Sequence, residues 1–121
     1  DTDTIPLKDL LIHKNLGAKA KNYKVIDKAT GIEYEFVPGT RIQNAEVFAG
    51  KGTRHSLNEG VPEGLTKQYE GADVNGWQHA KGFGVLVDPD TGEELPAEVH
   101  WFQEKSVGKV KFKVKRWLDE G

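Results

Sequence analysis

The residues of this chain with the most chemical potential lie near its C-terminal end, at the two-residue spacing that places side chains on one face of a β-strand. Glu98 and His100 share one such spacing, and Lys111 and Lys113 share another. A carboxylate, an imidazole and ammonium groups are the parts needed to cleave RNA without a metal. One group removes the proton of the 2′-hydroxyl, another protonates the leaving 5′-oxygen, and the cations stabilise the pentacoordinate phosphorus.

The residue types predict specific roles in this chemistry. We expect Glu98 to act as general base, His100 as general acid, and Lys111 and Lys113 as stabilisers of the phosphate. His79 is a further acid–base candidate, because it lies in a cluster of reactive residue types just before a predicted strand. Substrate contacts are expected from other basic residues, namely Lys51, Arg54, Lys81 and Lys109.

Each of these features also has a purely structural interpretation. A lysine-rich strand face is commonly a solvated surface that prevents aggregation. His100 lies between Val99 and Trp101, so it fits a histidine held in the packing as well as it fits a catalytic group. The segment 50–55 resembles a phosphate loop but lacks the spacing of a Walker A motif, so we reject binding of nucleoside triphosphates.

Neither a metal nor another cofactor is expected. The chain has no Cys, which excludes thiolate ligands and disulfides. Its four His, at positions 13, 55, 79 and 100, do not have the spacing of a metal site.

Composition predicts a single domain with one modest core. The chain has 121 residues, of which 36% are hydrophobic, and no apolar run approaches the roughly 20 residues that span a bilayer, so no membrane partner is expected. The net charge of -2 argues against a general nucleic-acid binder. The charge is segregated, however, because 88–98 is acidic and 105–116 is basic. The absence of Met, even at position 1, indicates a segment excised from a longer protein.

Hydrophobic periodicity predicts an α+β domain with one helix-packed antiparallel sheet. A short N-terminal helix is expected over 5–12, a β-hairpin over 23–27 and 32–37, and a strand over 41–49. A middle helix follows over 62–69, where Pro62 begins it and Gly71 ends it. A three-stranded antiparallel meander over 81–87, 96–103 and 109–117 completes the sheet, because its turns are too short for any other connection.

Alternation within the meander sorts its side chains into two faces. The apolar residues assigned to the core are Phe83, Val85, Val87, Ala97, Val99, Trp101, Val110, Phe112 and Val114. Glu98, His100 and the lysines of the last strand fall on the opposite, open face. Gly82 and Gly84 fall there too, where their missing side chains would let a nucleotide approach the backbone closely.

Short motifs give the chain a resemblance to a known family. They are Phe-Ala-Gly-Lys-Gly at 48–52, Val-Asp-Pro-Asp-Thr-Gly at 87–92, Val-His-Trp-Phe at 99–102 and Gly-Lys-Val at 108–110. In them the chain resembles the C-terminal domains of phage minor head (Mu F-like) proteins, which are similar to polymorphic-toxin ribonucleases of the barnase–EndoU–colicin–RelE group. The resemblance implies an antiparallel sheet whose open face cleaves RNA without a metal. It also implies a catalytic histidine at His100, with His79 as second choice.

The resemblance implies a partner and a location as well. RNA would be the substrate, and an acidic immunity protein or phage head components would be protein partners. The domain would be virion-associated or delivered to the bacterial cytoplasm. Two departures from the family, lysines in place of a last-strand histidine and an extra hairpin over 23–37, keep an alternative open. That alternative is a non-catalytic binding or structural module of a phage head protein that uses the basic face.

Overall fold

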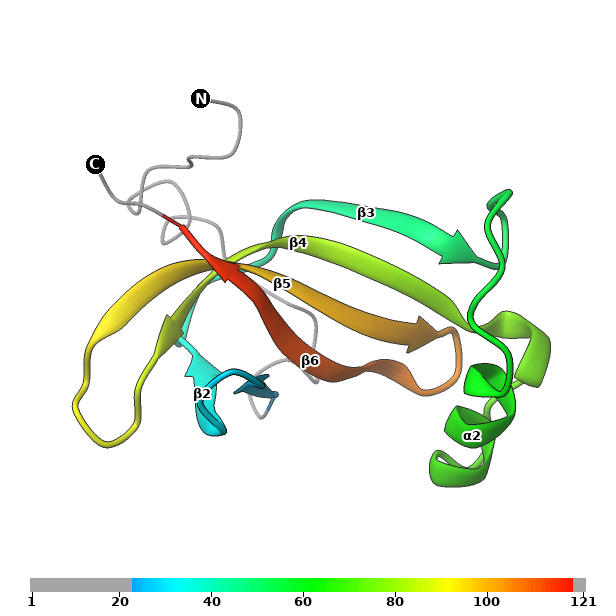
Figure 1. Cartoon of the computed structure of the whole chain (residues 1–121), viewed down its shortest axis with the longest axis horizontal. Coiled ribbons are helices and arrows are strands. Elements are labelled where there is room, and N and C mark those ends of the chain that lie inside the picture. Colours follow the sequence, from blue (N-terminus) through cyan, green and yellow to red (C-terminus); the bar gives the residue numbers. More distant parts are fainter. Residues whose placement is uncertain (1–22, 119–121) are drawn as a thin grey trace.

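The computed structural model describes residues 23–118 (Figure 1). Its strands are β1 (Lys24–Asp27), β2 (Ile32–Phe36), β3 (Gln43–Gly50), β4 (Gln78–Val87), β5 (Glu94–Glu104) and β6 (Gly108–Trp117), with the helix α2 (Val61–Gln68) and the short 3-10 turn η2 (Val74–Gly76) between β3 and β4. The predicted hairpin, third strand, middle helix and three C-terminal strands are confirmed. The predicted helix over 5–12 and His13 lie outside the described residues.

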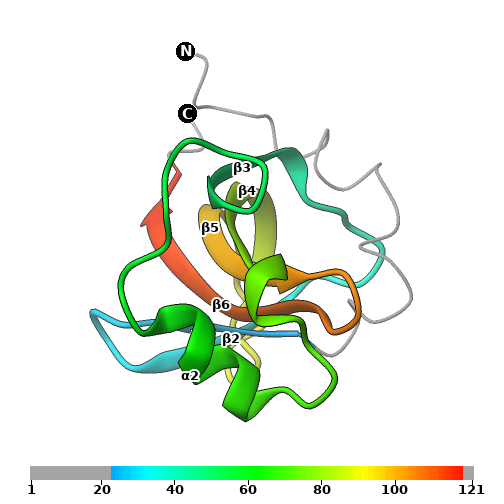
Figure 2. The same cartoon turned by 90° about the vertical axis from the view of Figure 1, so that its right-hand side faces the viewer.

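The strands close into a barrel. Their order is β2-β1-β6-β5-β4-β3, and β2 also pairs with β4, which completes a ring of five strands and leaves β3 as an extra strand (Figure 2). All pairings are antiparallel except that of β1 with β6, which is parallel. The expectation of an α+β domain with an open, helix-packed sheet is therefore wrong, because the described chain is mostly β.

The N-terminal hairpin is the reason for the closure. The meander of β4, β5 and β6 forms as predicted, but it has two free edges, one on β4 and one on β6. The first arm of the hairpin pairs with β6 and the second pairs with the far end of β4, where Phe36 lies opposite Leu86. Closure pairs the edge of β6 and the far end of β4, which an open sheet would leave exposed, while β3 pairs the rest of the β4 edge.

The barrel interior contains the aromatic core. Trp101 and Phe112 stack with their ring centroids 5.3 Å apart, and Phe36 meets Phe112 edge-on at 5.2 Å. Ala97, Val99 and Trp101 all point inward and are buried, as alternation in β5 predicts. Burial of such large side chains is the main favourable contribution to folding.

The face assignment predicted for β4 is reversed in the structure. Gly82 and Gly84 point into the barrel, where a Cβ on Gly84 would lie 2.8 Å from Cε1 of Phe36. Their missing side chains make room for the aromatic core, and not for a nucleotide. Val85 is fully buried in a second cluster with Val37, against which Phe83 and Val87 pack on the outer side of the strand.

The lysine stripe predicted for β6 is broken by two irregularities. The pairing with β5 shifts between Glu98 and Val99 and again between His100 and Phe102. Lys111, in the second irregularity, adopts a left-handed backbone with φ of 60°. As a result Val110 lies opposite Phe102 and Lys113 lies opposite His100, so the assignment of Val110 to the core is wrong. Such bulges redirect side chains that strict alternation would align.

Helix α2 lies beside one end of the barrel, and the turn between β4 and β5 projects from the other end (Figure 1). Leu65 is the buried residue of α2, and Thr66 of the same helix accepts a hydrogen bond of 3.0 Å from the indole N–H of the buried Trp77. In the described part of the chain, no helix is long and apolar enough to cross a membrane.

Candidate active site on the outer face of the barrel

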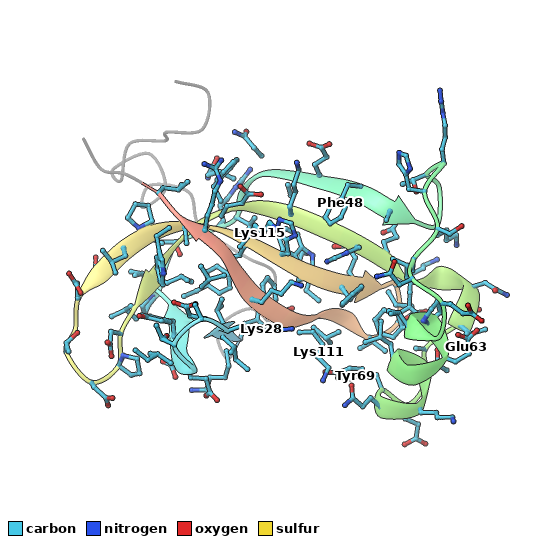
Figure 3. The ribbon with its side chains drawn as sticks, viewed as in Figure 1. Lys28, Phe48, Glu63, Tyr69, Lys111 and Lys115 are labelled. Carbon is cyan, nitrogen blue, oxygen red and sulfur yellow. The ribbon has the colours of Figure 1, made fainter. Side chains whose placement is uncertain are left out.

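The titratable side chains gather on the outer face of β4, β5 and β6. In the strand register His100 lies between Lys81 of β4 and Lys113 of β6. His79 lies two pairs further along on the same face, opposite Phe102. The extra strand β3 adds Phe48, whose ring contacts both imidazoles (Figure 3). Four of the five predicted catalytic residues, Glu98, His100, Lys113 and His79, are therefore brought together.

Glu98 is held at both carboxylate oxygens. Its Oε2 lies 3.0 Å from Nε2 of His100, and its Oε1 accepts a 2.6 Å hydrogen bond from Nε of Arg116. Burial alone would raise the pKa of Glu98, but the hydrogen bonds from Arg116 and His100 outweigh it and keep the pKa below its ordinary value. An ionised carboxylate with both oxygens engaged is suited to orient His100, and less suited to the role of general base predicted for it.

His100 is nearly buried, with 12% of its side chain exposed. Burial lowers its pKa, the ionised Glu98 raises it, and the ammonium groups of Lys115 and Lys113 lower it again, for a net decrease. Because Nε2 faces the carboxylate, Nδ1 is the nitrogen left for exchange of a proton with a substrate.

His79 has a different environment. Its ring stacks on Phe102 at 4.3 Å, contacts Phe48 at 4.4 Å and lies 5.7 Å from the ring of His100. Its Nε2 is buried and has no hydrogen-bond partner. Burial, the neighbouring His100 and Lys113 lower its pKa to about 4, so the imidazole is neutral at pH 7.

Lys113 contributes a partly desolvated cation. Burial lowers its pKa, and the nearby charges of Lys28 and Lys115 lower it further. Within residues 23–118 no carboxylate forms an ion pair with it. Figure 3 labels Lys111 and Lys115 of β6, and Lys28, which lies in the turn between β1 and β2. Cations that repel one another and lack acidic partners favour the binding of an anion.

The other predicted site residues do not join this cluster. Lys111 is exposed at its irregularity in β6, and Arg54 is exposed in the loop after β3. Lys51 and Lys109 line a separate hollow of about 630 Å³ that also contains Gln78 and Gln103. Of the predicted substrate contacts, only Lys81 lies beside His100.

Two residues of the site were missed by sequence reasoning. Arg116 reaches Glu98 because the shift in the β5–β6 register places it directly opposite. Phe48 covers the imidazoles from a position where the pairing of β3 with β4 is irregular. Strict alternation cannot find either residue, because both positions depend on irregular pairing.

Neither a search for metal-binding groups nor comparison with known proteins assigns a function to this cluster. Over the described range 23–118, no group of His, Asp and Glu is arranged to hold a metal ion. Comparisons of the chain with protein-family models, with curated proteins and with solved structures found no match.

Proposed function

We propose that the domain is a metal-independent endoribonuclease that cleaves RNA through a 2′,3′-cyclic phosphate. The observation that carries the proposal is the pair of imidazoles on one face, 5.7 Å apart, one of which, His100, faces the carboxylate of Glu98 at 3.0 Å. The carboxylate favours the protonated form of His100, which suits His100 to the role of acid and leaves the neutral His79 as the base. The unpaired ammonium of Lys113 beside them supplies the charge that a phosphodiester requires.

The reaction follows from these environments. The neutral His79 takes the proton of the 2′-hydroxyl, and the 2′-oxygen attacks phosphorus. Lys113 stabilises the extra negative charge of the pentacoordinate state. The bond from phosphorus to the 5′-oxygen then breaks, and protonated His100 gives its proton to that oxygen. Glu98, held by Arg116, orients His100 and stabilises its protonated form.

The short motifs shared with phage minor head proteins and toxin ribonucleases suggest where this activity would be used. In that context the domain is the tail of a longer phage or toxin protein. RNA is its substrate, and an acidic immunity protein is its inhibitor. The wider basic patch of Lys28, Lys113 and Lys115 would face either polyanion.

One observation favours a second function, a binding module without catalysis. Only 12% of the His100 side chain and 11% of the Glu98 side chain are exposed. Buried ion-pair networks that stabilise a fold also shift pKa values, so these shifts alone do not establish catalysis. A binding module would hold RNA or an acidic protein on the lysines, with an affinity that falls as salt rises and with no cleaved product.

Incubation of the purified domain with total RNA in excess EDTA tests the proposal. The wild type should release fragments that end in 2′,3′-cyclic phosphate, and His100→Ala should not. His55→Ala is the matched control, because His55 is exposed in the loop after β3 and should be dispensable. Intact RNA with all three folded proteins would reject the nuclease and leave the binding module.

A further inference from the structure

A hollow of about 360 Å³ opens beside His79 on the outer face. Its wall on the barrel side is formed by Phe48, Phe102 and His79, and the loop after β3 closes it with Leu57 and Asn58. This volume is near the lower end of the ~300–1,000 Å³ found for small-molecule sites, so it suits a single ring system and not a large ligand.

The walls of the hollow are suited to a planar ring. Phe48 and Phe102 present aromatic surface, and Leu57 and Val61 present aliphatic surface. Every nucleobase can stack on an aromatic side chain, because every base has a π-face, so stacking does not depend on the sequence of the RNA. The larger hollow lined by Lys51 and Lys109 has no aromatic residue in its lining and does not share this property.

Polar groups lie at the rim of the same hollow. The side chains of Ser56 and Asn58 make no hydrogen bond within residues 23–118, although both can donate and accept. His79 and Lys113 belong to the lining as well. Groups that read the edge of a base and groups that act on a phosphate therefore share one lining.

We propose that this hollow binds one unpaired nucleobase of the RNA, from a nucleotide adjoining the phosphate that is cleaved. The proposal rests on the proposed ribonuclease function and deepens it. The base stacks against Phe48, since His79 already stacks on Phe102. Ser56 and Asn58 bond the edge of the base, and its phosphate faces Lys113. Because a base must leave a duplex to enter the hollow, the substrate is single-stranded RNA.

Nucleotide binding tests this inference without any cleavage. AMP, UMP and ribose 5-phosphate would each be titrated into the ¹³C-labelled domain, with the ring signals of Phe48 and Phe102 followed by NMR. At least one nucleotide should bind about tenfold more tightly than ribose 5-phosphate, since stacking on an aromatic residue has roughly that effect. Equal affinities of all three compounds would overturn the proposal.

Two variants locate the effect. Leu57→Trp fills the hollow and should bring the affinity of the nucleotides down to that of ribose 5-phosphate. Ser56→Trp, at an exposed rim position, serves the same purpose if Leu57→Trp does not fold. Ile32→Trp is the control, because Ile32 is exposed on β2 and absent from the lining. Unchanged nucleotide affinity in a folded Leu57→Trp or Ser56→Trp protein would contradict the assignment.

The two proposals fail separately. RNA cleavage in EDTA without preferential nucleotide binding would keep the ribonuclease and reject the base site. Preferential nucleotide binding without cleavage would keep the base site and reject the ribonuclease. Faster cleavage of duplex than of single-stranded RNA of the same sequence would also reject the base site.

Discussion

The two faces of strand β5 carry side chains of opposite character, apolar on the inner face and titratable on the outer face. Ala97, Val99 and Trp101 point inward and are at most 1% exposed, and the indole N–H of Trp101 donates to Gln103 at 2.8 Å. Glu98 and His100 point outward, next to the imidazole of His79, whose Nε2 is buried without a partner. The inner face packs closely and satisfies its polar groups, whereas the outer face retains an unsatisfied one.

This difference indicates what each face contributes. An unsatisfied buried polar group costs roughly 1–3 kcal/mol, and the mutual repulsion of Lys28, Lys113 and Lys115 adds to that cost. Perturbed titratable groups of this kind concentrate at functional sites. Substitutions on the inner face should therefore reduce stability, and substitutions on the outer face should reduce activity while stability stays constant or rises.

The largest effect is expected for His79→Phe on the outer face. It keeps the ring between Phe48 and Phe102 and removes the proposed base, so the rate of RNA cleavage should fall about 10²–10⁴-fold. The free energy of unfolding at pH 7 should be unchanged or higher, because the unpartnered nitrogen is lost. Initial rates in EDTA and urea unfolding measure the two quantities. A loss of activity matched by a loss of fold would remove the contrast between the faces.

The inner face is tested by Gly82→Ala. The added Cβ would lie 3.1 Å from the indole of Trp101 and 3.2 Å from the backbone oxygen of Gln43, and it would also strike Ile42. Overpacking of this kind costs typically 1–3 kcal/mol. Gly64→Ala in α2 is the control, because its Cβ would meet no atom within 4 Å and Ala favours a helix. Equal unfolding midpoints for the two variants would contradict the inward direction of Gly82.

The pH dependence of stability tests the contribution of His79, on the outer face. The folded pKa of His79 is about 4 and the ordinary pKa of a histidine is 6.5, so between these values the unfolded chain binds a proton that the folded chain does not bind. Stability from this group is complete above pH 6.5 and is lost as pH falls toward 4, by at most about 1.4 kcal/mol per pH unit. Unfolding of wild type and His79→Phe at pH 5 and pH 7.5 measures it. The advantage of the variant should be greater at pH 5; a pH-independent difference would refute the shift.

The smallest effect is expected at the edge of the basic patch. Burial lowers the pKa of Lys113 most, and Lys28 and then Lys115 lower it further. Lys28→Ser should therefore raise the pKa of Lys113 toward its ordinary value without altering the fold. An NMR titration of the lysine ¹³Cε signals detects the change, and Lys67→Ser, exposed on α2, provides the control. Identical Lys113 titrations in Lys28→Ser and Lys67→Ser would show that Lys28 does not act on this group.

Alternation predicted the faces of β5 and failed for β4, and the reason lies in residue types. Ala97, Val99 and Trp101 contrast clearly with Glu98 and His100, so only one assignment fits. In β4 the alternatives are apolar residues and glycines, and a glycine shows no preference for either face. Its inward direction depends on the bulk of Phe36 and Trp101, which come from other strands.

Closure of the barrel and completion of the site both depend on pairing between strands that lie far apart in the sequence, which local periodicity does not predict. The hairpin over 24–36 pairs with β6 and with the end of β4, far along the chain, and local periodicity carries no information on such partners. The approach of His79 to His100 depends in the same way on the β4–β5 register. Arg116 and Phe48 depend on irregular pairing, so the predicted site lacked them.

The parallel pairing of β1 with β6 has a consequence for the order in which the molecule can form during synthesis. Val25 pairs with Phe112, and the indole N–H of Trp117 donates to Asp27 across 90 residues of sequence. Such distant contacts slow folding, and a chain emerging from the ribosome cannot make them until its last strand is free. Arg116 and Lys113 lie on that same strand, so a truncated nascent chain has neither a closed barrel nor a complete catalytic cluster. A chain whose β6 has not yet emerged would therefore lack the ribonuclease activity that we propose.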